Sequence, residues 1–267
     1  MNPPDPHGFF KPLSVMETHR HVGMKPVLKK LNGQDLHSPA SKSLIHAMST
    51  DLRSVFREQN IMLGLILVIS MIFAAQMMYG PDIYWSYMMV PQKMVVAWNA
   101  ALIGDLDLTA FLPMLTCAFL HGGFDHLLFN MLLLWVFGAL AVELVGNKWM
   151  LITFVLTAFC GSVFHVVMNP DSTIPTLGAS GAVMGFEGLY LGMAVRWHLP
   201  DPEIWPIARP IPPAQLAALG IIGLIMDYMG FLGGNLGVAY SAHLGGFVGG
   251  ILLGSTIVPM PRVARPR

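Results

Sequence analysis

The sequence predicts an all-α protein, a polytopic membrane bundle of six transmembrane helices. Apolar residues make up 54% of the 267 residues, and charged residues make up only 11%. A soluble domain carries about 25% charged residues. Mean hydropathy is +0.60, and six separate apolar segments interrupt the chain. The formal net charge is zero, so nothing in the composition indicates a nucleic-acid partner.

Each of six segments reaches or approaches the length of about 20 mainly apolar residues that a spanning helix needs. Two of them are short, and the helices there are expected to begin below the membrane surface, with a water-filled dip above each. These two are 127–142 and 180–195. The full set is 61–79, 127–142, 149–168, 180–195, 214–232 and 240–258.

The remaining segments define the expected domain organisation. Residues 1–60 are polar, basic and rich in proline, which predicts a cytoplasmic N-terminal tail or, alternatively, a small folded or membrane-surface module. Residues 61–258 form the membrane domain and 259–267 a cytoplasmic C-terminal tail. The connection 80–120 contains two tryptophans and is too apolar for a solvated loop, so we expect short helices in the membrane interface.

The distribution of basic residues predicts the orientation. Lys and Arg concentrate in cytoplasmic loops. With both termini cytoplasmic, fourteen of the fifteen Lys and Arg lie inside and only Lys93 lies outside. The second, fourth and sixth helices then all begin at the outer face. No seventh span or organelle-targeting segment is evident, which favours a multi-pass protein of the bacterial cytoplasmic (inner) membrane.

A serine and a histidine stand at the heads of two of these helices. Ser180 begins the segment 180–195, and His243 lies near the start of 240–258. A serine hydroxyl needs a base to become a good nucleophile, and histidine titrates near neutral pH. Placed side by side beneath the outer surface, the pair indicates a Ser-His dyad for peptide-bond hydrolysis inside the bilayer.

The two helices must pack closely for these side chains to meet, and small residues spaced by four permit that in lipid. Helix packing alone would explain any one of these runs, but not a serine at one head and a histidine at the other. The runs are Gly181, Gly185, Gly188 and Gly192 in one helix, and Ala242, Gly246 and Gly250 in the other.

Candidate oxyanion donors lie at the same level. The Ser180 N–H is a free donor at the positive end of a helix dipole. His126 and Asn130 share one helix face at i and i+4, and both side chains can donate. For Asn130 an interhelical hydrogen bond is the alternative. His121 falls off that face, so a structural role in holding the loop is expected.

No acidic third member is evident near His243. Glu187 lies about 10 Å deeper than Ser180 at 1.5 Å per residue, which favours a two-member dyad. For Glu187 and Asp227 structural hydrogen bonding is expected, although intramembrane acids are functional candidates. His165 is expected to be a hydrogen-bonded core residue.

A metal site or a disulfide is not favoured. His121, His126 and His243 could converge, but HExxH is absent and no nearby carboxylate completes a ligand set. We therefore expect no metal and no cofactor. Cys117 and Cys160 lie in or beside apolar segments, so two buried thiols are favoured over a structural disulfide.

These residues resemble the three core motifs of the rhomboid intramembrane serine proteases, in order along a rhomboid-like bundle. The motifs are the runs HGGFDHLLFN at 121–130, GASG at 178–181 and AHLGG at 242–246. The resemblance covers 61–258. It implies that Ser180 attacks the scissile carbonyl and that His243 acts as general base and then acid.

The same resemblance implies further roles. The Ser180 N–H, His126 and Asn130 would form the oxyanion hole. Substrates would be single-pass membrane proteins, cut near the outer boundary of the bilayer without a cofactor. The segment 80–120 would match the membrane-embedded first loop and the fifth helix the substrate gate. Supporting positions would be His121, Gly178, Gly181 and Glu143.

Two departures from the family pattern and two alternatives accompany this interpretation. The Trp-Arg pair that some members have in the first loop is missing. Many bacterial members have tyrosine four residues after the nucleophile, where this chain has Met184, whose thioether can also pack against the histidine. A non-catalytic rhomboid-like protein that binds membrane clients is one alternative. A transporter or ion pathway, motivated by His165, Glu187 and Asp227, is the other, but the inverted repeats it requires are not evident.

Overall fold

The computed structural model describes residues 56–199, 238–261 and 265–266, together with seven isolated helical positions between residues 215 and 232. The described chain is mostly helical. The expected tail or module 1–60 lies outside the described residues apart from its last five positions. Most of the expected span 214–232, including Asp227, also lies outside them.

Three of the described helices are long and apolar enough to cross a membrane: α3 (Asn60–Tyr79), α7 (Phe124–Val145) and α8 (Asn147–Met168). Two shorter helices complete the packed group. They are α9 (Ser180–Arg196) and α11 (Tyr240–Leu252), which continues as the π-helical turn η4 (Leu253–Ile257). Five of the predicted apolar segments therefore coincide with helices.

The prediction of a short second helix was wrong. α7 has 22 residues and begins at Phe124, three residues before the expected start at 127. Asp125 and His126 interrupt the apolar pattern, but both fit the first helical turn. Asp125 there faces the positive end of the helix dipole, which stabilises a carboxylate. α9, with 17 residues, is short as predicted.

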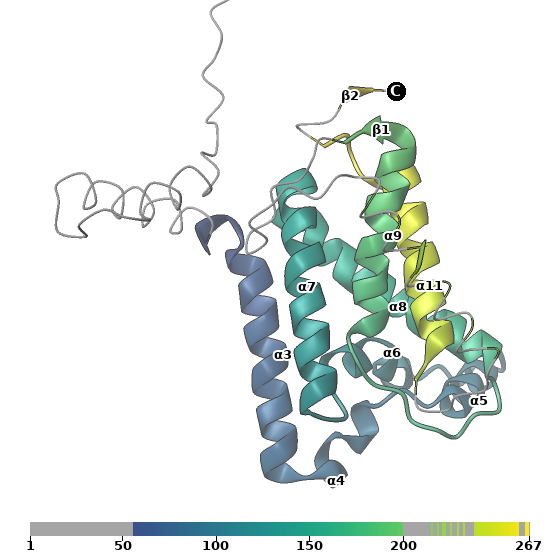
Figure 1. Cartoon of the computed structure of the whole chain (residues 1–267). Coiled ribbons are helices and arrows are strands. Elements are labelled where there is room, and N and C mark those ends of the chain that lie inside the picture. The colour runs from purple at the N-terminus through teal and green to yellow at the C-terminus, as the bar shows by residue number, and fades with distance from the viewer. Residues whose placement is uncertain are drawn as a thin grey trace, which may run out of the picture. The chain divides into compact units, whose positions relative to one another are not determined.

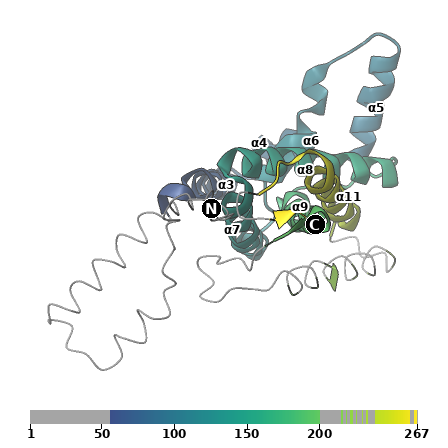
Figure 2. The ribbon, with the colours of Figure 1, turned by 90° about the horizontal axis from the view of Figure 1, so that it is seen from above.

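Short helices fill the connection 80–120, as the sequence predicts. α5 projects away from the packed helices (Figure 2), and its exposed face carries Val96, Trp98 and Leu102. α5 and α6 each begin at a proline, the residue whose missing N–H costs nothing in a first turn. The elements are α4 (Pro81–Tyr84), η1 (Trp85–Tyr87), α5 (Pro91–Leu102), η2 (Leu108–Phe111), α6 (Pro113–Thr116) and η3 (Cys117–Phe119).

α9 and α11 lie side by side in both ribbon views (Figures 1 and 2), and glycines make the contact. A Cβ added at Gly246 would overlap the carbonyl of Gly181, and one added at Gly250 would overlap the carbonyl of Gly185. The backbones thus touch where side chains would otherwise separate them. The predicted close packing through small residues is confirmed.

α8 packs against the same pair of helices. A Cβ added at Gly161 of α8 would lie 2.7 Å from the carbonyl oxygen of Ala242 in α11. α7, α9 and α11 all begin at the same end of this bundle, the lower end in Figure 1. This shared end brings the first turns of three helices to one level, as expected for the second, fourth and sixth predicted helices.

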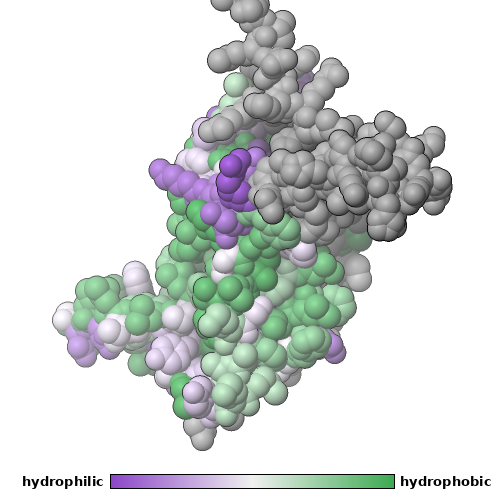
Figure 3. Space-filling model, turned by 90° about the vertical axis from the view of Figure 1, so that its left-hand side faces the viewer, coloured by the Kyte–Doolittle hydropathy of each residue, from purple (hydrophilic) through white to green (hydrophobic). Residues whose placement is uncertain are grey.

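Apolar side chains cover the outer surface of the bundle. Figure 3 shows one face on which they form a broad band. On α3 alone, the exposed side chains include Leu67, Met71 and Met77, which are 59%, 63% and 71% exposed. Such an extended apolar face would be unfavourable in water. With the three long apolar helices, it makes the chain an integral membrane protein.

β1 (Trp197–His198) and β2 (Arg265–Pro266) form a two-stranded antiparallel pair in which Trp197 lies opposite Pro266. This pair joins the end of α9 to the segment 259–267, which the sequence predicts as a C-terminal tail. Residues 265–266 of that segment therefore pair with the strand that follows α9.

The glycine contact predicts a specific stability effect. Gly250→Ala should lower the free energy of unfolding by about 1–3 kcal/mol, because the added methyl forces two helix backbones apart. Gly64→Ala is the matched control, since nothing lies within 4 Å of a Cβ at that position of α3. Thermal unfolding in detergent micelles measures both, and equal midpoints for the two variants would contradict the contact.

Candidate active site

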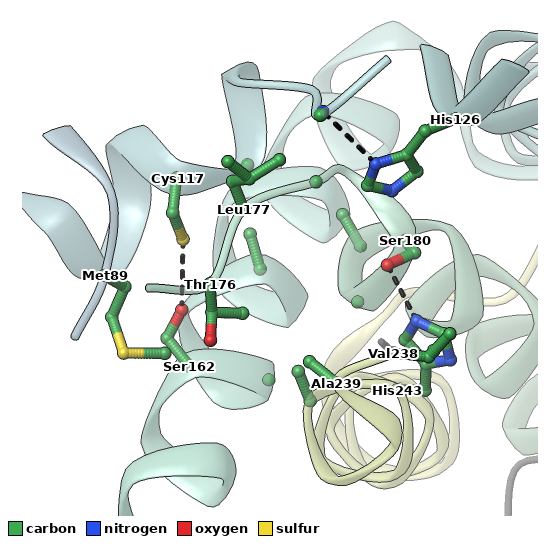
Figure 4. A pocket seen from close by; sticks show the side chains of 18 of the residues that line it. Met89, Cys117, His126, Ser162, Thr176, Leu177, Ser180, Val238, Ala239 and His243 are labelled. Carbon is green, nitrogen blue, oxygen red and sulfur yellow. Dashed lines mark hydrogen bonds between the residues drawn. The ribbon is translucent and has the colours of Figure 1, made fainter. Parts of the chain in front are cut away.

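Ser180 and His243 meet at the ends of α9 and α11. The Ser180 Oγ and the His243 Nε2 lie 2.7 Å apart, within hydrogen-bonding distance. Figure 4 shows the serine hydroxyl pointing at the imidazole. Both residues line a cavity of about 550 Å³. A hydroxyl that donates to a neutral imidazole nitrogen is poised to lose its proton to that nitrogen.

The turn before Ser180 depends on a glycine. Gly178 has φ of 128°, a backbone conformation that other residues rarely adopt. Its N–H donates to the carbonyl of Cys117 at 2.9 Å. A Cβ at this position would lie 2.8 Å from the His126 ring and 3.7 Å from the Ser180 Oγ. The missing side chain therefore keeps open the space between His126 and Ser180.

α9 begins directly at Ser180. The first intrahelical bond runs from the Val183 N–H to the Ala179 carbonyl at 3.0 Å. The N–H groups of Ser180, Gly181 and Ala182 precede that bond, so helix geometry provides no carbonyl for them. All three residues line the cavity. The positive end of the α9 dipole thus faces the space beside the serine hydroxyl.

His243 is held by residues at the start of its own helix and by Ser180 of α9. Its N–H donates to the Ala239 carbonyl at 3.3 Å. The Tyr240 ring packs edge-on against the imidazole, with ring centroids 6.2 Å apart. Met184, which replaces the aromatic residue expected beneath the base, is buried in α9. Tyr240 was not predicted, although its i, i+3 spacing from His243 on a helix was a signal for this contact.

His126 presents a donor to the same space. Its Nδ1 accepts the Gly122 N–H at 3.4 Å, which leaves the proton of a neutral ring on Nε2. The Nε2 is one of the two ring atoms 2.8 Å from the Cβ that Gly178 lacks, and the Ser180 Oγ is 3.7 Å from that point. An oxygen atom of a bound molecule could therefore approach both the His126 Nε2–H and Ser180.

Asn130 lies deeper than His126. It is buried, and its Nδ2 donates to the His126 carbonyl at 2.8 Å within α7. It is not among the residues that line the cavity. The bond actually made is intrahelical, rather than the interhelical bond considered as the alternative from sequence.

His121 holds the turn that leads into α7. Its N–H donates to the Gln76 Oε1 at 3.0 Å, and the Gln76 Nε2 donates back to its carbonyl at 3.2 Å. Its ring packs edge-on against His126, with centroids 5.1 Å apart. Burial, with a smaller contribution from His126, lowers the pKa of His121 to about 4. The neutral ring accepts the Ala179 N–H at 3.5 Å.

Gln76 was not predicted as part of the site. The signal was its position as the only amide side chain in the uncharged segment 61–79. A buried amide in such a helix must find partners, because an unmet buried polar group costs about 1–3 kcal/mol. It finds them in the backbone of His121.

Other predicted residues lie elsewhere. Glu143 is near the far end of α7, about 26 Å along the helix axis from His126 at 1.5 Å per residue, and its side chain is exposed. Gly181 lies against α11, with its missing Cβ 3.3 Å from the carbonyl oxygen of Ala242. Glu187 is half-buried in α9 and is not in the cavity wall.

Cys117 and Cys160 are both free thiols, as the sequence favoured. The Cys117 Sγ lies 3.6 Å from the Ser162 Oγ at the end of the cavity away from His243 (Figure 4). Within the part of the chain that the structure describes, no three His, Cys, Asp or Glu side chains are placed to hold a metal ion.

Comparison with known families agrees with this architecture. The family model for the rhomboid domain matches residues 109–260, which is more than half of the chain. The chain belongs to the rhomboid family. The matched region contains every cavity-lining residue except Met89.

Several curated relatives are similar to this rhomboid protein. It is 28% identical to the putative rhomboid protease YdcA of Bacillus subtilis over 175 residues, 64% of this chain and 81% of that protein. It is 28% identical to the rhomboid protease GluP of the same bacterium over 54% of this chain. It is 30% identical to the mitochondrial Rhomboid protein 1 of Saccharomyces cerevisiae over 55% of this chain. The matches span only 25% of GluP and 42% of the yeast protein.

Proposed function

We propose that this protein is an intramembrane serine endopeptidase that cleaves transmembrane segments of other membrane proteins through a dyad of Ser180 and His243. The observation that carries the proposal is the 2.7 Å separation of the Ser180 Oγ and the His243 Nε2 in a cavity. The names of the two Bacillus subtilis relatives, both rhomboid proteases, support the same activity.

The geometry supports an acyl-transfer sequence in two steps. The Ser180 Oγ bonds to the scissile carbonyl carbon while its proton passes to the His243 Nε2. The imidazolium then gives that proton to the leaving amine nitrogen as the C–N bond breaks, which leaves an acyl-enzyme. Water loses a proton to His243 and attacks the ester, and Ser180 recovers its proton from the imidazolium as it leaves.

The oxyanion of each step would lie in the space that Gly178 leaves open. We propose the Ser180 N–H, at the start of α9, and the His126 Nε2–H as its donors, since both residues line the cavity. Asn130 would act by a second route, because its amide is bonded to the His126 carbonyl and lies outside the cavity wall. We propose that it positions His126 and reaches the oxyanion only if that bond is released.

Other residues would support this framework. His121 and Gln76 hold the turn before His126, while Gly178 and Gly181 permit the close approach of α9 to its neighbours. Tyr240 packs edge-on against the base, and Met184, four residues after Ser180, would pack against the ring from α9. Glu143, far along α7, would serve the fold at the opposite end of the helix.

The membrane placement follows from the same proposal. We propose six transmembrane helices with both termini cytoplasmic, in a bacterial inner membrane. The first turns of α7, α9 and α11 would then lie near the outer face. Substrates would be single-pass membrane proteins whose helices unwind at that level, so that an extended peptide can enter the cavity. Neither a metal nor a cofactor takes part.

The dyad predicts a labelling pattern that separates a protease from a non-catalytic client-binding protein. A fluorophosphonate should modify Ser180 in the wild-type protein in liposomes, and Ser180→Ala and His243→Ala should each abolish both labelling and substrate cleavage. Ser255→Ala is the matched control, because that hydroxyl lies at the far end of α11 in η4. Cleavage of a reconstituted substrate by Ser180→Ala protein would overturn the mechanism.

The two oxyanion candidates should differ in effect. His126→Ala removes a donor at the cavity and should lower kcat by about 10²–10³-fold, the usual loss for one oxyanion donor. Asn130→Ala should lower kcat less, because Asn130 acts through His126. Steady-state cleavage by each folded variant measures both values. A larger loss for Asn130→Ala would show that its amide turns toward the oxyanion during catalysis.

A further inference from the structure

Four polar side chains form a hydrogen-bonded cluster behind the Ser180–His243 pair. His165 comes from the last turn of α8 and Asn169 directly follows that helix, while Thr176 comes from the extended segment before α9 and Ser241 from the first turn of α11. We call these four residues the His165 cluster. Ser241 is only 2% exposed, and the other three are partly buried.

Both ring nitrogens of His165 have partners. The Nδ1 lies 2.6 Å from the Ser241 Oγ, and the Nε2 lies 3.1 Å from the Thr176 Oγ1. The Asn169 Nδ2 donates to the Ser241 Oγ at 3.0 Å and to the His165 carbonyl at 3.1 Å. One imidazole therefore connects three elements that are separated along the chain.

The donors and acceptors of the cluster match one another. The Asn169 amide nitrogen can only donate, so the Ser241 oxygen accepts its hydrogen bond. The Ser241 and Thr176 hydroxyls can each donate or accept, so they satisfy the two ring nitrogens of His165 in either neutral tautomer. Each polar group of the cluster therefore has a partner in this geometry.

The two ends of the cluster lie next to the two halves of the proposed dyad. Ser241 is two residues before His243, in the same helical turn. Thr176 is four residues before Ser180 and lines the cavity. Its backbone is held on the other side by Met89, through paired bonds of 2.7 and 3.1 Å. His165 thus joins α8 to both segments by hydrogen bonds.

The contacts of Gly246 and Gly250 with α9 set the separation of the helix axes, and both glycines lie on the C-terminal side of His243. On the other side of His243, the hydrogen bonds of Ser241 hold the first turn of α11. Ser241 is a polar anchor in the first turn, and a rotation of α11 would pull it from His165 and Asn169. The same rotation would carry His243 away from the Ser180 Oγ.

We propose that His165 is a positioning residue that sets the orientation of His243 through Ser241 and the position of the cavity wall through Thr176. The inference rests on the proposed protease activity and extends it to residues that touch neither the serine nor the substrate's reacting atoms. The link to Ser241 governs kcat. The link to Thr176 governs KM, because it holds a segment that the substrate must contact.

Single substitutions separate the two links. Ser241→Ala should lower kcat about tenfold or more with KM unchanged, since a misplacement of about 1 Å can cost on the order of 10²-fold. Thr176→Val keeps the shape of the side chain and should raise KM with little change in kcat. Cleavage of a reconstituted single-pass substrate in liposomes provides both constants.

Substitutions of His165 itself provide a test by partial rescue. His165→Leu should impair both constants. His165→Asn places an amide oxygen near the former Nδ1 and should recover kcat alone. His165→Gln places its amide near the former Nε2 and should recover KM alone. A merely structural role would instead lower all activities together with the thermal unfolding midpoint.

The rate of Ser180 modification by a fluorophosphonate, measured in the same liposomes, separates the possible failures. A wild-type protein that is not labelled would overturn the protease proposal and this inference together. If the wild-type protein is labelled and Ser241→Ala and His165→Leu are labelled as fast as the wild type, this inference alone would be overturned. We expect Ser241→Ala and His165→Leu to be labelled more slowly than the wild-type protein. His165→Asn should recover the wild-type rate, and the control Ser255→Ala should be labelled at the wild-type rate. If Ser241→Ala does not fold, the comparison of His165→Leu with His165→Asn decides.

Discussion

The backbone contact between α9 and α11 is the constraint on which the site depends. Gly246 meets the carbonyl of Gly181. Gly181 is one residue after Ser180 in α9, and Gly246 is three residues after His243 in α11. Because the helices touch without intervening side chains, a short serine can reach an imidazole on the neighbouring helix. Any residue larger than glycine at this contact would separate the two groups. The membrane favours such packing, since lipid supplies no hydrophobic force between helices and close van der Waals contact replaces it.

A second group of contacts keeps the space around the serine open and its donors directed. Gly178 lacks the side chain that would collide with His126, and the first N–H groups of α9 face the cavity. Gln76 and His121 hold the preceding turn from α3. The His165 cluster holds α11 and the cavity wall from α8. The geometry of the proposed dyad is thus supported by polar contacts from helices that themselves contribute neither Ser180 nor His243.

Much of this was predictable from sequence, because it depends on local pattern. Ser180 and His243 lie at the starts of two apolar segments that are predicted to cross the membrane in the same direction. The glycine spacing indicates which faces of these two helices meet. The start of α7 was missed because Asp125 and His126 break the apolar run although a helix accepts them in its first turn. The hydrogen bonds of Asn130, Gln76, Thr176 and Ser241 were not predictable, since they depend on the paths of connecting segments. The fifth expected span remains a prediction.

The most direct test of the central claim is a graded series at Gly246. Ser180 phosphonylation by a fluorophosphonate should slow progressively from wild type to Gly246→Ala to Gly246→Val, because each added carbon separates α11 further from α9. Gly64→Ala and Gly64→Val, in the open position on α3, should react at the wild-type rate. Wild-type reactivity in a folded Gly246→Val protein would contradict the claim that this backbone contact brings the serine and the histidine together.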